Sequence, residues 1–221
     1  MLADSSGVAV WPAHATLLVS DLHLEKGTAS AGRGVFLPPY DTRETLNRLA
    51  DAIARYEPRR VVALGDSFHS AHAADGLDAD RLAQVAALQS GREWVWITGN
   101  HDPAVPKRLG GDVCNELMLD GLALRHRPAA STDSGASEIA GHLHPAARLA
   151  KNGSAVRRRC FISDPRRMIM PAFGALAGGL NVLDEAFSLL FGAGLRSSKV
   201  AVRMLGNGNV FSVSPRLLVG D

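Results

Sequence analysis

The segment Trp94-Val-Trp-Ile-Thr-Gly-Asn-His-Asp102 joins a short apolar run directly to a group of polar residues. The run over 94–98, rich in aromatic and β-branched side chains, predicts a buried strand. Asn100, His101 and Asp102 follow its carboxyl end, the edge at which open α/β sheets bind their ligands. The segment therefore predicts a sheet, and it also indicates which edge of that sheet carries the chemistry.

Two earlier segments repeat this pattern. Apolar runs at 15–20 and 60–64 predict further strands, and each is followed closely by an aspartate. Between the strands, Asp41 and Asp78 are expected to cap helices, and Glu44 would complete a capping box with Asp41. Strands that alternate with helices in this way predict an α/β layered sheet.

The second half of the chain has few helical patterns, and one short helix is expected over 184–190. A hairpin turn is expected at 206–209, and a flexible surface loop at 129–136. Short strands are expected at 122–125, 155–162, 167–170, 199–205 and 210–213. We therefore expect a second, mainly antiparallel sheet packed on the first, within a single domain over residues 1–221.

Side chains that can bind metal follow the predicted strands one after another. Their oxygen and nitrogen donors suit divalent Mn, Fe or Zn, whereas two cysteines are too few for a structural zinc site. The candidates outnumber the ligands of one tetrahedral ion and suit two ions that share a carboxylate. They are Asp21, His23, Asp66, Asn100, His126, His142 and His144.

The ordered motifs DxH, GD, GNHD, H and GHxH resemble those of the calcineurin-like metallophosphoesterases. GNHD at 99–102 and GHxH at 141–144 are the most specific of these motifs. A narrower resemblance is to the bacterial ligase-associated DNA damage response endonucleases, in the segments 21–27, 37–42, 65–69, 141–145, 171–174 and 178–182.

This resemblance implies an α/β fold, a sandwich of two mixed β-sheets flanked by helices. It also implies a phosphodiesterase with two divalent metal ions, Mn²⁺ before Fe or Zn, that cuts DNA internally during damage repair. The first metal would be held by Asp21, His23 and His144. The second would be held by Asn100, His126 and His142, with Asp66 bridging both. The attacking group would be a hydroxide held between the metals.

The same resemblance assigns roles to two residues beside the ligands. His101 would face the substrate and protonate the leaving oxygen or stabilise the phosphorane. Asp102 would orient the His101 imidazole. An intact ligand set together with this pair argues against a non-catalytic, metal-binding interaction module. Hydrolysis of a small phosphomonoester, phosphodiester or cyclic nucleotide stays open as an alternative.

Three residues are candidates for substrate contact. Lys26 and Arg33 lie in the loop 25–34 beside the first metal motif, which is either a phosphate-gripping lid or an ordinary connection. His69 follows the Gly-Asp motif and either lines the cleft or lies on the surface.

A basic stretch later in the chain comprises Arg157, Arg158, Arg159, Arg166 and Arg167. Charged side chains commonly protect an exposed strand edge, and we favour that interpretation. The alternative is contact with the phosphate backbone of a nucleic acid.

The 221-residue chain has a formal net charge of +2 and two cysteines, Cys114 and Cys160. The bulk charge does not indicate a protein that coats polyanions, and the cysteine count indicates a reducing compartment. No secretory signal or long apolar stretch is visible, so a cytoplasmic location without membrane association is expected. The expected partners are DNA or another phosphodiester and, from the resemblance, a DNA ligase or repair system.

Overall fold

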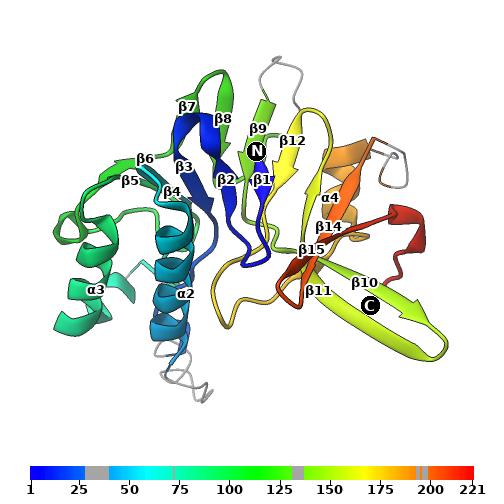
Figure 1. Ribbon diagram of the computed structural model, residues 1–221, viewed down its shortest axis with the longest axis horizontal. Coiled ribbons are helices and arrows are strands. Elements are labelled where there is room, and N and C mark those ends of the chain that lie inside the picture. The colour runs from blue at the N-terminus through cyan, green and yellow to red at the C-terminus, as the bar shows by residue number, and fades with distance from the viewer. Residues whose placement is uncertain (28–39, 72, 131–136, 193–194, 196–198) are drawn as a thin grey trace.

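The computed structural model describes residues 1–27, 40–71, 73–130, 137–192, 195 and 199–221. Within these residues the strands form two sheets that pack face to face, and helices lie on the outer faces (Figure 1). Both sheets contain parallel and antiparallel pairs. The predicted α/β sandwich of two mixed sheets flanked by helices is therefore confirmed.

The first sheet has the strand order β1-β2-β3-β4-β5-β6. The pairs from β3 to β6 are parallel, whereas β1 and β2 add antiparallel strands at one edge. Side chains of β3 are buried on both faces, which accounts for its continuous apolar run. The strands are β1 (Leu2–Ala3), β2 (Ala9–Trp11), β3 (Thr16–Val19), β4 (Arg60–Leu64), β5 (Glu93–Ile97) and β6 (Asp112–Cys114).

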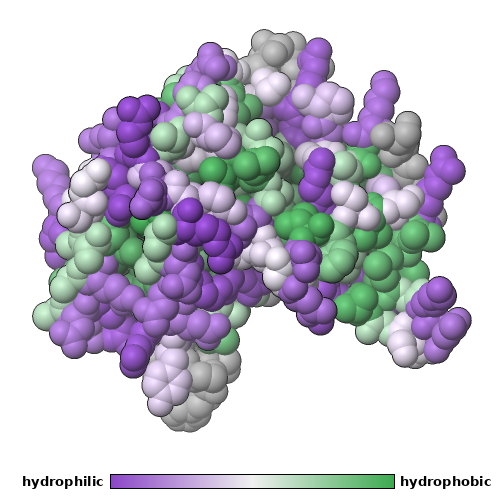
Figure 2. Space-filling view, in the orientation of Figure 1, coloured by the Kyte–Doolittle hydropathy of each residue, from purple (hydrophilic) through white to green (hydrophobic). Residues whose placement is uncertain are grey.

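Two helices, α2 (Asp41–Tyr56) and α3 (Ala79–Gln89), cover the outer face of the first sheet. In α2, Leu46, Leu49 and Ile53 recur at helical spacing and are buried against the sheet. The opposite faces of both helices carry the hydrophilic side chains that gather at the lower left of Figure 2.

The predicted capping of these helices is confirmed for one and wrong for the other. Asp78 caps α3, because its side chain accepts a hydrogen bond from Arg81 N at 2.8 Å. The N-cap of α2 is Tyr40, and no side chain caps it. Asp41 instead lies inside the first turn, where its buried carboxylate accepts from Gly27 N at 2.9 Å. It therefore ties the segment after the first metal motif to α2.

The second sheet follows the order β13-β10-β11-β12-β9-β8-β7, with β14 paired to β11 and β15 to β14. The parallel pairs are β8–β9, β9–β12 and β10–β13. The predicted hairpin turn joins β14 to β15, with a φ of 49° at Asn207 and 72° at Gly208. The strands are β7 (Glu116–Leu119), β8 (Leu122–Arg125), β9 (Ser137–Ala140), β10 (Pro145–Lys151), β11 (Ser154–Ser163), β12 (Arg167–Ile169), β13 (Leu180–Asn181), β14 (Ala201–Gly206) and β15 (Asn209–Val213).

Helix α4 (Glu185–Phe191) packs on the outer face of the second sheet through the buried ring of Phe187. Between the sheets, apolar side chains from β3, β4 and β5 meet Phe161 and Met170. Most of the predicted loop at 129–136 lies outside the described residues. Short 3₁₀ helices lie at Pro12–His14, Ala73–Gly76, Lys107–Leu109 and Pro215–Leu217.

The N-terminal segment is fixed to α2 by Asp4. Its carboxylate accepts a hydrogen bond from Tyr56 Oη at 2.6 Å and lies 3.3 Å from Arg55 Nη1. Burial would raise the pKa of Asp4, but hydrogen bonds from Ser6 and Tyr56 hold it below its ordinary value.

Both cysteines are unpaired, and Cys160 is buried. Among the described residues, no helix is both long and apolar enough to cross a membrane.

Candidate metal centre

All seven predicted ligands lie at one edge of the sandwich, beyond the carboxyl ends of five strands. Asp21 and His23 follow β3, Asp66 follows β4, and Asn100 follows β5. From the second sheet, His126 follows β8, and the pair at 142 and 144 follows β9. Because β3, β4 and β5 are parallel neighbours, as are β8 and β9, both sheets bring their loops to this edge.

The first group of donors consists of Asp21, His23 and His144, whose ligand atoms lie within 4.8 Å of one another. The Nε2 atoms of the two histidines are 3.2 Å apart, and His144 Nε2 is 3.2 Å from Asp21 Oδ1. The carboxylate of Asp21 is fully buried, and its Oδ2 accepts hydrogen bonds from Ser20 Oγ and from His142 N. These bonds fix the carboxylate so that its other oxygen, Oδ1, faces the histidine His144.

The second group consists of Asp66, His126 and His142, and Asn100 joins it. His126 Nε2 lies 3.4 Å from Asp66 Oδ2, 3.2 Å from His142 Nδ1 and 3.0 Å from Asn100 Oδ1. The other ring nitrogen of His126 is 3.0 Å from the carbonyl oxygen of Leu64. If Nδ1 donates its hydrogen to this carbonyl, Nε2 keeps a lone pair for a metal, and histidines that bind metals are commonly held by such a hydrogen bond.

The backbone of the centre is unusual at the ligands themselves. Five of them have a φ in the left-handed region, between 45° and 72°: Asp21, His23, Asp66, His142 and His144. Residues other than glycine seldom adopt this conformation, and each instance costs about 1–3 kcal/mol. The tight turns after the strands therefore aim these side chains into one space.

Two motif glycines are required because of close approach. A Cβ at Gly99 would lie 2.1 Å from Asp66 Oδ1, and one at Gly141 would lie 1.9 Å from Ser20 Oγ. Neither gap admits a methyl group. The glycines in GNHD and GHxH therefore leave room for the carboxylates to settle against the backbone.

The electrostatics of the centre keep its carboxylates ionised. Burial would raise the pKa of Asp66, but hydrogen bonding and the positive field of His126 lower it to about 2. The pKa of Asp21 is also lowered, because His144 and His126 outweigh its burial. Burial lowers the pKa of His23 to about 4, so this imidazole is neutral and can offer a lone pair at neutral pH.

The donor set fits divalent metal ions. Asp21 Oδ1 is buried and, among the described residues, makes no hydrogen bond of ordinary geometry, although His144 Nε2 lies close to it. Lone pairs of oxygen and imidazole nitrogen that converge in this way suit a shared cation. The two groups adjoin, since His126 Nδ1 is 3.8 Å from Asp21 Oδ1. The residues present therefore fit two ions side by side.

His101 lies at the mouth of this centre, as expected. Its side chain is 42% exposed, and its Nε2 is 3.9 Å from Asp66 Oδ2. Its ring stacks on His69 with 5.4 Å between ring centroids. The ring centroid of His69 also lies 5.7 Å from that of His23, so His69 is close to the first group, and its contact with a substrate stays a prediction.

Among the described residues, the Asp102 carboxylate makes no hydrogen bond to the His101 ring, contrary to the expectation from sequence. The carboxylate is 1% exposed and accepts four backbone hydrogen bonds, from Asp66 N, Ser67 N, Phe68 N and Gly99 N, at 2.6–3.1 Å. Burial together with the charge of Asp66 raises its pKa to about 6. Asp102 therefore holds the backbone that carries Asp66.

The other predicted contact residues have different outcomes. Lys26 Nζ donates to the carbonyl of Leu176 at 3.1 Å, so it fixes the segment 172–177. Arg33, with most of the loop 25–34, lies outside the described residues. One basic residue beside the centre was not among the predicted contacts: Arg127 directly follows His126, is exposed, and lines a pocket of about 380 Å³ together with Asn100. Its position next to a ligand at a strand end was the available signal.

The basic stretch is not a uniform solvated edge. Arg167 is buried and donates from Nε to Glu138 Oε1 at 2.5 Å. Arg159 donates to five backbone carbonyls between 172 and 177. Arg157 and Arg158 are both exposed, and Arg157 pairs with Asp221 at 3.0 Å. The favoured interpretation is therefore wrong for Arg159 and Arg167.

Among solved structures, the chain is similar to the nuclease MPE of Pseudomonas putida. The TM-score is 0.70 and the sequence identity is 25%, over 96% of this chain and 93% of that one. A second similar structure is the phosphoesterase Yfce from E. coli, with a TM-score of 0.43 and 13% identity over 90% of this chain and 98% of that one. No protein-family model and no curated protein matches the sequence. The predicted resemblance to the calcineurin-like metallophosphoesterases is confirmed.

Proposed function

We propose that this chain, which has the calcineurin-like metallophosphoesterase fold, hydrolyses phosphodiester bonds in DNA at a centre of two divalent metal ions. One observation carries the proposal. Two donor groups lie side by side at the strand ends, in a fold shared with the Pseudomonas putida nuclease over 96% of the chain. The motif resemblance supports endonuclease action on DNA in particular.

Two divalent ions bound by these groups would neutralise charge on the phosphate and lower the pKa of a water. The chain's own residues then have distinct tasks. Asp66, a member of the second group, would be the bridging ligand, and the His101 amide, which donates to its Oδ1 at 2.8 Å, fixes its orientation. Arg127 adds positive charge beside the second group, where an incoming phosphate would lie.

His101 is the residue placed to transfer a proton. Its ring is exposed at the mouth of the centre, so Nε2 can reach an oxygen of a bound phosphodiester. Donation of its proton to the leaving oxygen would let the P–O bond break without forming a free alkoxide. The neighbouring ring of His69 limits the orientations of the imidazole.

We propose Mn²⁺ as the resident metal on the basis of the motif resemblance, and the mixture of carboxylate, imidazole and amide donors can bind it. Fe or Zn would bind the same donors, so metal content must be measured on protein purified without added metal.

We further propose that the protein acts in the cytoplasm in repair of DNA damage beside a ligase, and that residues 1–221 form one domain. The motif resemblance supports the first proposal. The apolar core shared by the two sheets supports the second. A single unfolding transition would test the second.

The test compares three substrates with Mn²⁺: a circular single-stranded DNA, bis(p-nitrophenyl) phosphate and p-nitrophenyl phosphate. An Asp66→Asn variant, which keeps the side-chain volume, is the control. Linearisation of the circle, lost in the variant, is expected. Hydrolysis of the small esters alone would indicate a small phosphoester as the substrate. Binding of two metals without turnover of any substrate would indicate the non-catalytic module.

A further inference from the structure

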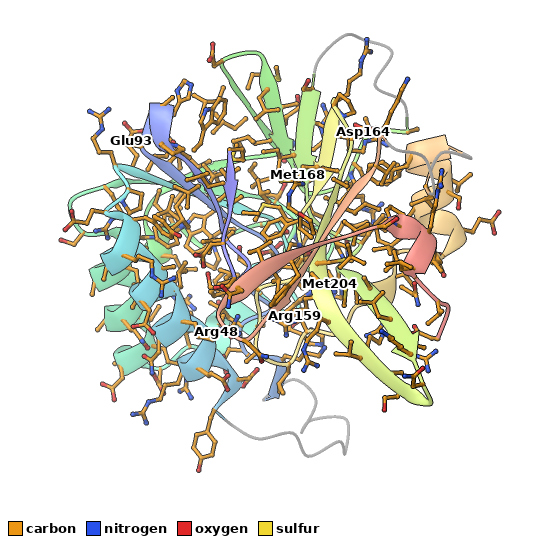
Figure 3. The ribbon with its side chains drawn as sticks, turned by 45° about the vertical axis from the view of Figure 1, so that its right-hand side comes forward. Arg48, Glu93, Arg159, Asp164, Met168 and Met204 are labelled. Atoms are coloured by element: carbon orange, nitrogen blue, oxygen red, sulfur yellow. The ribbon has the colours of Figure 1, made fainter. Side chains whose placement is uncertain are left out.

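A second basic site lies outside the metal centre. A pocket of about 380 Å³ opens between α2, β11, the β14–β15 turn and the segment 177–179. Four arginines line it: Arg48, Arg157, Arg158 and Arg159. Figure 3 labels Arg48 and Arg159, which lie between α2 and the β14–β15 hairpin. No acidic side chain is among the described residues that line the pocket.

Two of the arginines build the wall of the pocket. Arg48 Nη2 donates to Ser6 O at 3.1 Å, and its guanidinium lies 4.6 Å from the centre of the Phe173 ring. Arg159 is held by its carbonyl partners. Burial and the charge of Arg48 lower the pKa of Arg159, while Glu44 offsets part of this effect, so positive charge is concentrated here. An anion would relieve that repulsion.

Arg158 supplies the charge that a ligand can reach. It is exposed, and its guanidinium bonds only to the carbonyl of Arg157, at 3.1 Å, within the part of the chain that the structure describes. The guanidinium of Arg157, by contrast, is already paired with the carboxylate of Asp221. Arg158 therefore keeps most of its fork of donors for an anion, and guanidinium groups bind phosphate oxygens in this way.

Glycines leave the backbone open on the other side of the pocket. The amides of Gly178 and Gly179 make no backbone hydrogen bond to any described residue. A Cβ at Gly178 would meet nothing within 4 Å, so the space above it is free. Backbone N–H groups beside arginines form a favourable setting for a phosphate.

The same segment separates the pocket from the first group of metal ligands. Gly174 N donates to Asp21 O at 3.1 Å, and a Cβ at Gly179 would lie 2.9 Å from His144 O. The segment 174–179 therefore contacts the metal ligands, while Arg159 and the pocket lie against it as well. A polymer with regularly spaced phosphates has a phosphate to offer at each of the two places, whereas a small phosphomonoester has only one.

We propose that this arginine pocket binds a second backbone phosphate of a DNA strand whose scissile phosphate lies at the metal centre. The inference rests on the proposed function, because it takes the substrate to be a polynucleotide. Contacts to a second phosphate fix the position of a strand without reading its sequence. The pocket would thus select long strands over mononucleotides.

The test measures binding of a fluorescent single-stranded oligonucleotide at several salt concentrations, in the Asp66→Asn background so that the strand stays intact. Arg158→Ala is expected to weaken binding about tenfold, the equivalent of one charged hydrogen bond. It should also reduce the slope of log Kd against log salt by about 0.7, the value for one phosphate on a single strand. Arg216→Ala is the matched control, since Arg216 is also exposed and lies outside the pocket.

A second variant, Gly178→Asp, places a negative charge at the open position and should weaken binding more than Arg158→Ala does. Equal effects of Arg158→Ala and Arg216→Ala would overturn the pocket, and so would an unchanged Kd in Gly178→Asp. If the unmodified protein cuts DNA in either case, the proposed function stands and the pocket alone fails. If the unmodified protein neither binds nor cuts DNA, both proposals fail together.

Discussion

Arg159→Lys tests how the segment beside the metal centre is held. The guanidinium donates from two nitrogens to five carbonyls at 2.7–3.3 Å, those of residues 172, 173, 174, 175 and 177. Lysine keeps the charge, but it offers donors from a single nitrogen and cannot match the fork of arginine. We expect it to reach about two of the carbonyls and to lose the rest.

The expected loss in the free energy of unfolding follows from the number of hydrogen bonds that Arg159→Lys removes. Each hydrogen bond to a charged group contributes about 1.5–3 kcal/mol when buried, and Arg159 is half-buried, so about 1 kcal/mol each is reasonable. The loss of about three bonds lowers the free energy of unfolding by about 2–4 kcal/mol. Urea denaturation should show this as a midpoint lower by about 1–2 M. Arg158→Lys, next to it and exposed, should change stability by less than about 0.5 kcal/mol.

The same variant should also weaken metal binding. The segment that Arg159 holds donates from Phe173 N to Ser20 O and from Gly174 N to Asp21 O, so it supports the backbone of a ligand. Calorimetric titration with Mn²⁺ should show an affinity about tenfold lower, as for other supporting contacts of metal ligands. Equal midpoints for Arg159→Lys and Arg158→Lys would refute the stability argument. A lower midpoint with unchanged Mn²⁺ affinity would refute the link to Asp21.

Three further predictions concern other parts of the molecule. Gly99→Ala places a methyl group 2.1 Å from Asp66 Oδ1 and should lower Mn²⁺ affinity at least about tenfold by titration, whereas Gly76→Ala, which meets no atom, should leave it unchanged. His101→Asn should retain both metals and lower kcat about 10²–10⁴-fold; loss of metal would show instead that His101 is a ligand. Asp4 has a lowered pKa, so its contribution is complete above its ordinary value of 3.8 and disappears as the pH falls through the lowered value. Asp4→Asn should therefore be less stable than the unmodified chain at neutral pH, and the difference should shrink as the pH falls below 3.8, as measured by thermal unfolding.

Local patterns predicted the strands that lie in the middle of the sandwich. The apolar runs that became β3, β4 and β5 are buried on both faces along nearly their whole length, so their composition alone identified them. The strand β10 was missed, because Pro-Ala-Ala-Arg-Leu-Ala-Lys at 145–151 is rich in helix-forming residues. Its pairing with β11 over six residue positions outweighs that preference. Such pairing depends on residues distant in the sequence and leaves no local trace.

The convergence of the candidate ligands could be predicted, because each one follows a strand and the carboxyl ends of neighbouring parallel strands meet at one edge. The role of Asp102 could not, since it depends on where the amides of Ser67 and Phe68 point once the turn has formed. The capping box at Asp41 failed for a similar reason. The amide of Gly27, far away in the sequence, binds the carboxylate that would otherwise have capped the helix.

The left-handed backbone at Asp21, His23, Asp66, His142 and His144 has a consequence for protein engineering. Side chains copied onto ordinary extended or helical positions of another scaffold would point elsewhere, even with every ligand present. A transplant of this centre must carry over the turns that follow the strands, together with the glycines that make room for them. Conversely, random mutagenesis of these turns should return active variants seldom, because shape and chemistry would have to be restored in the same step.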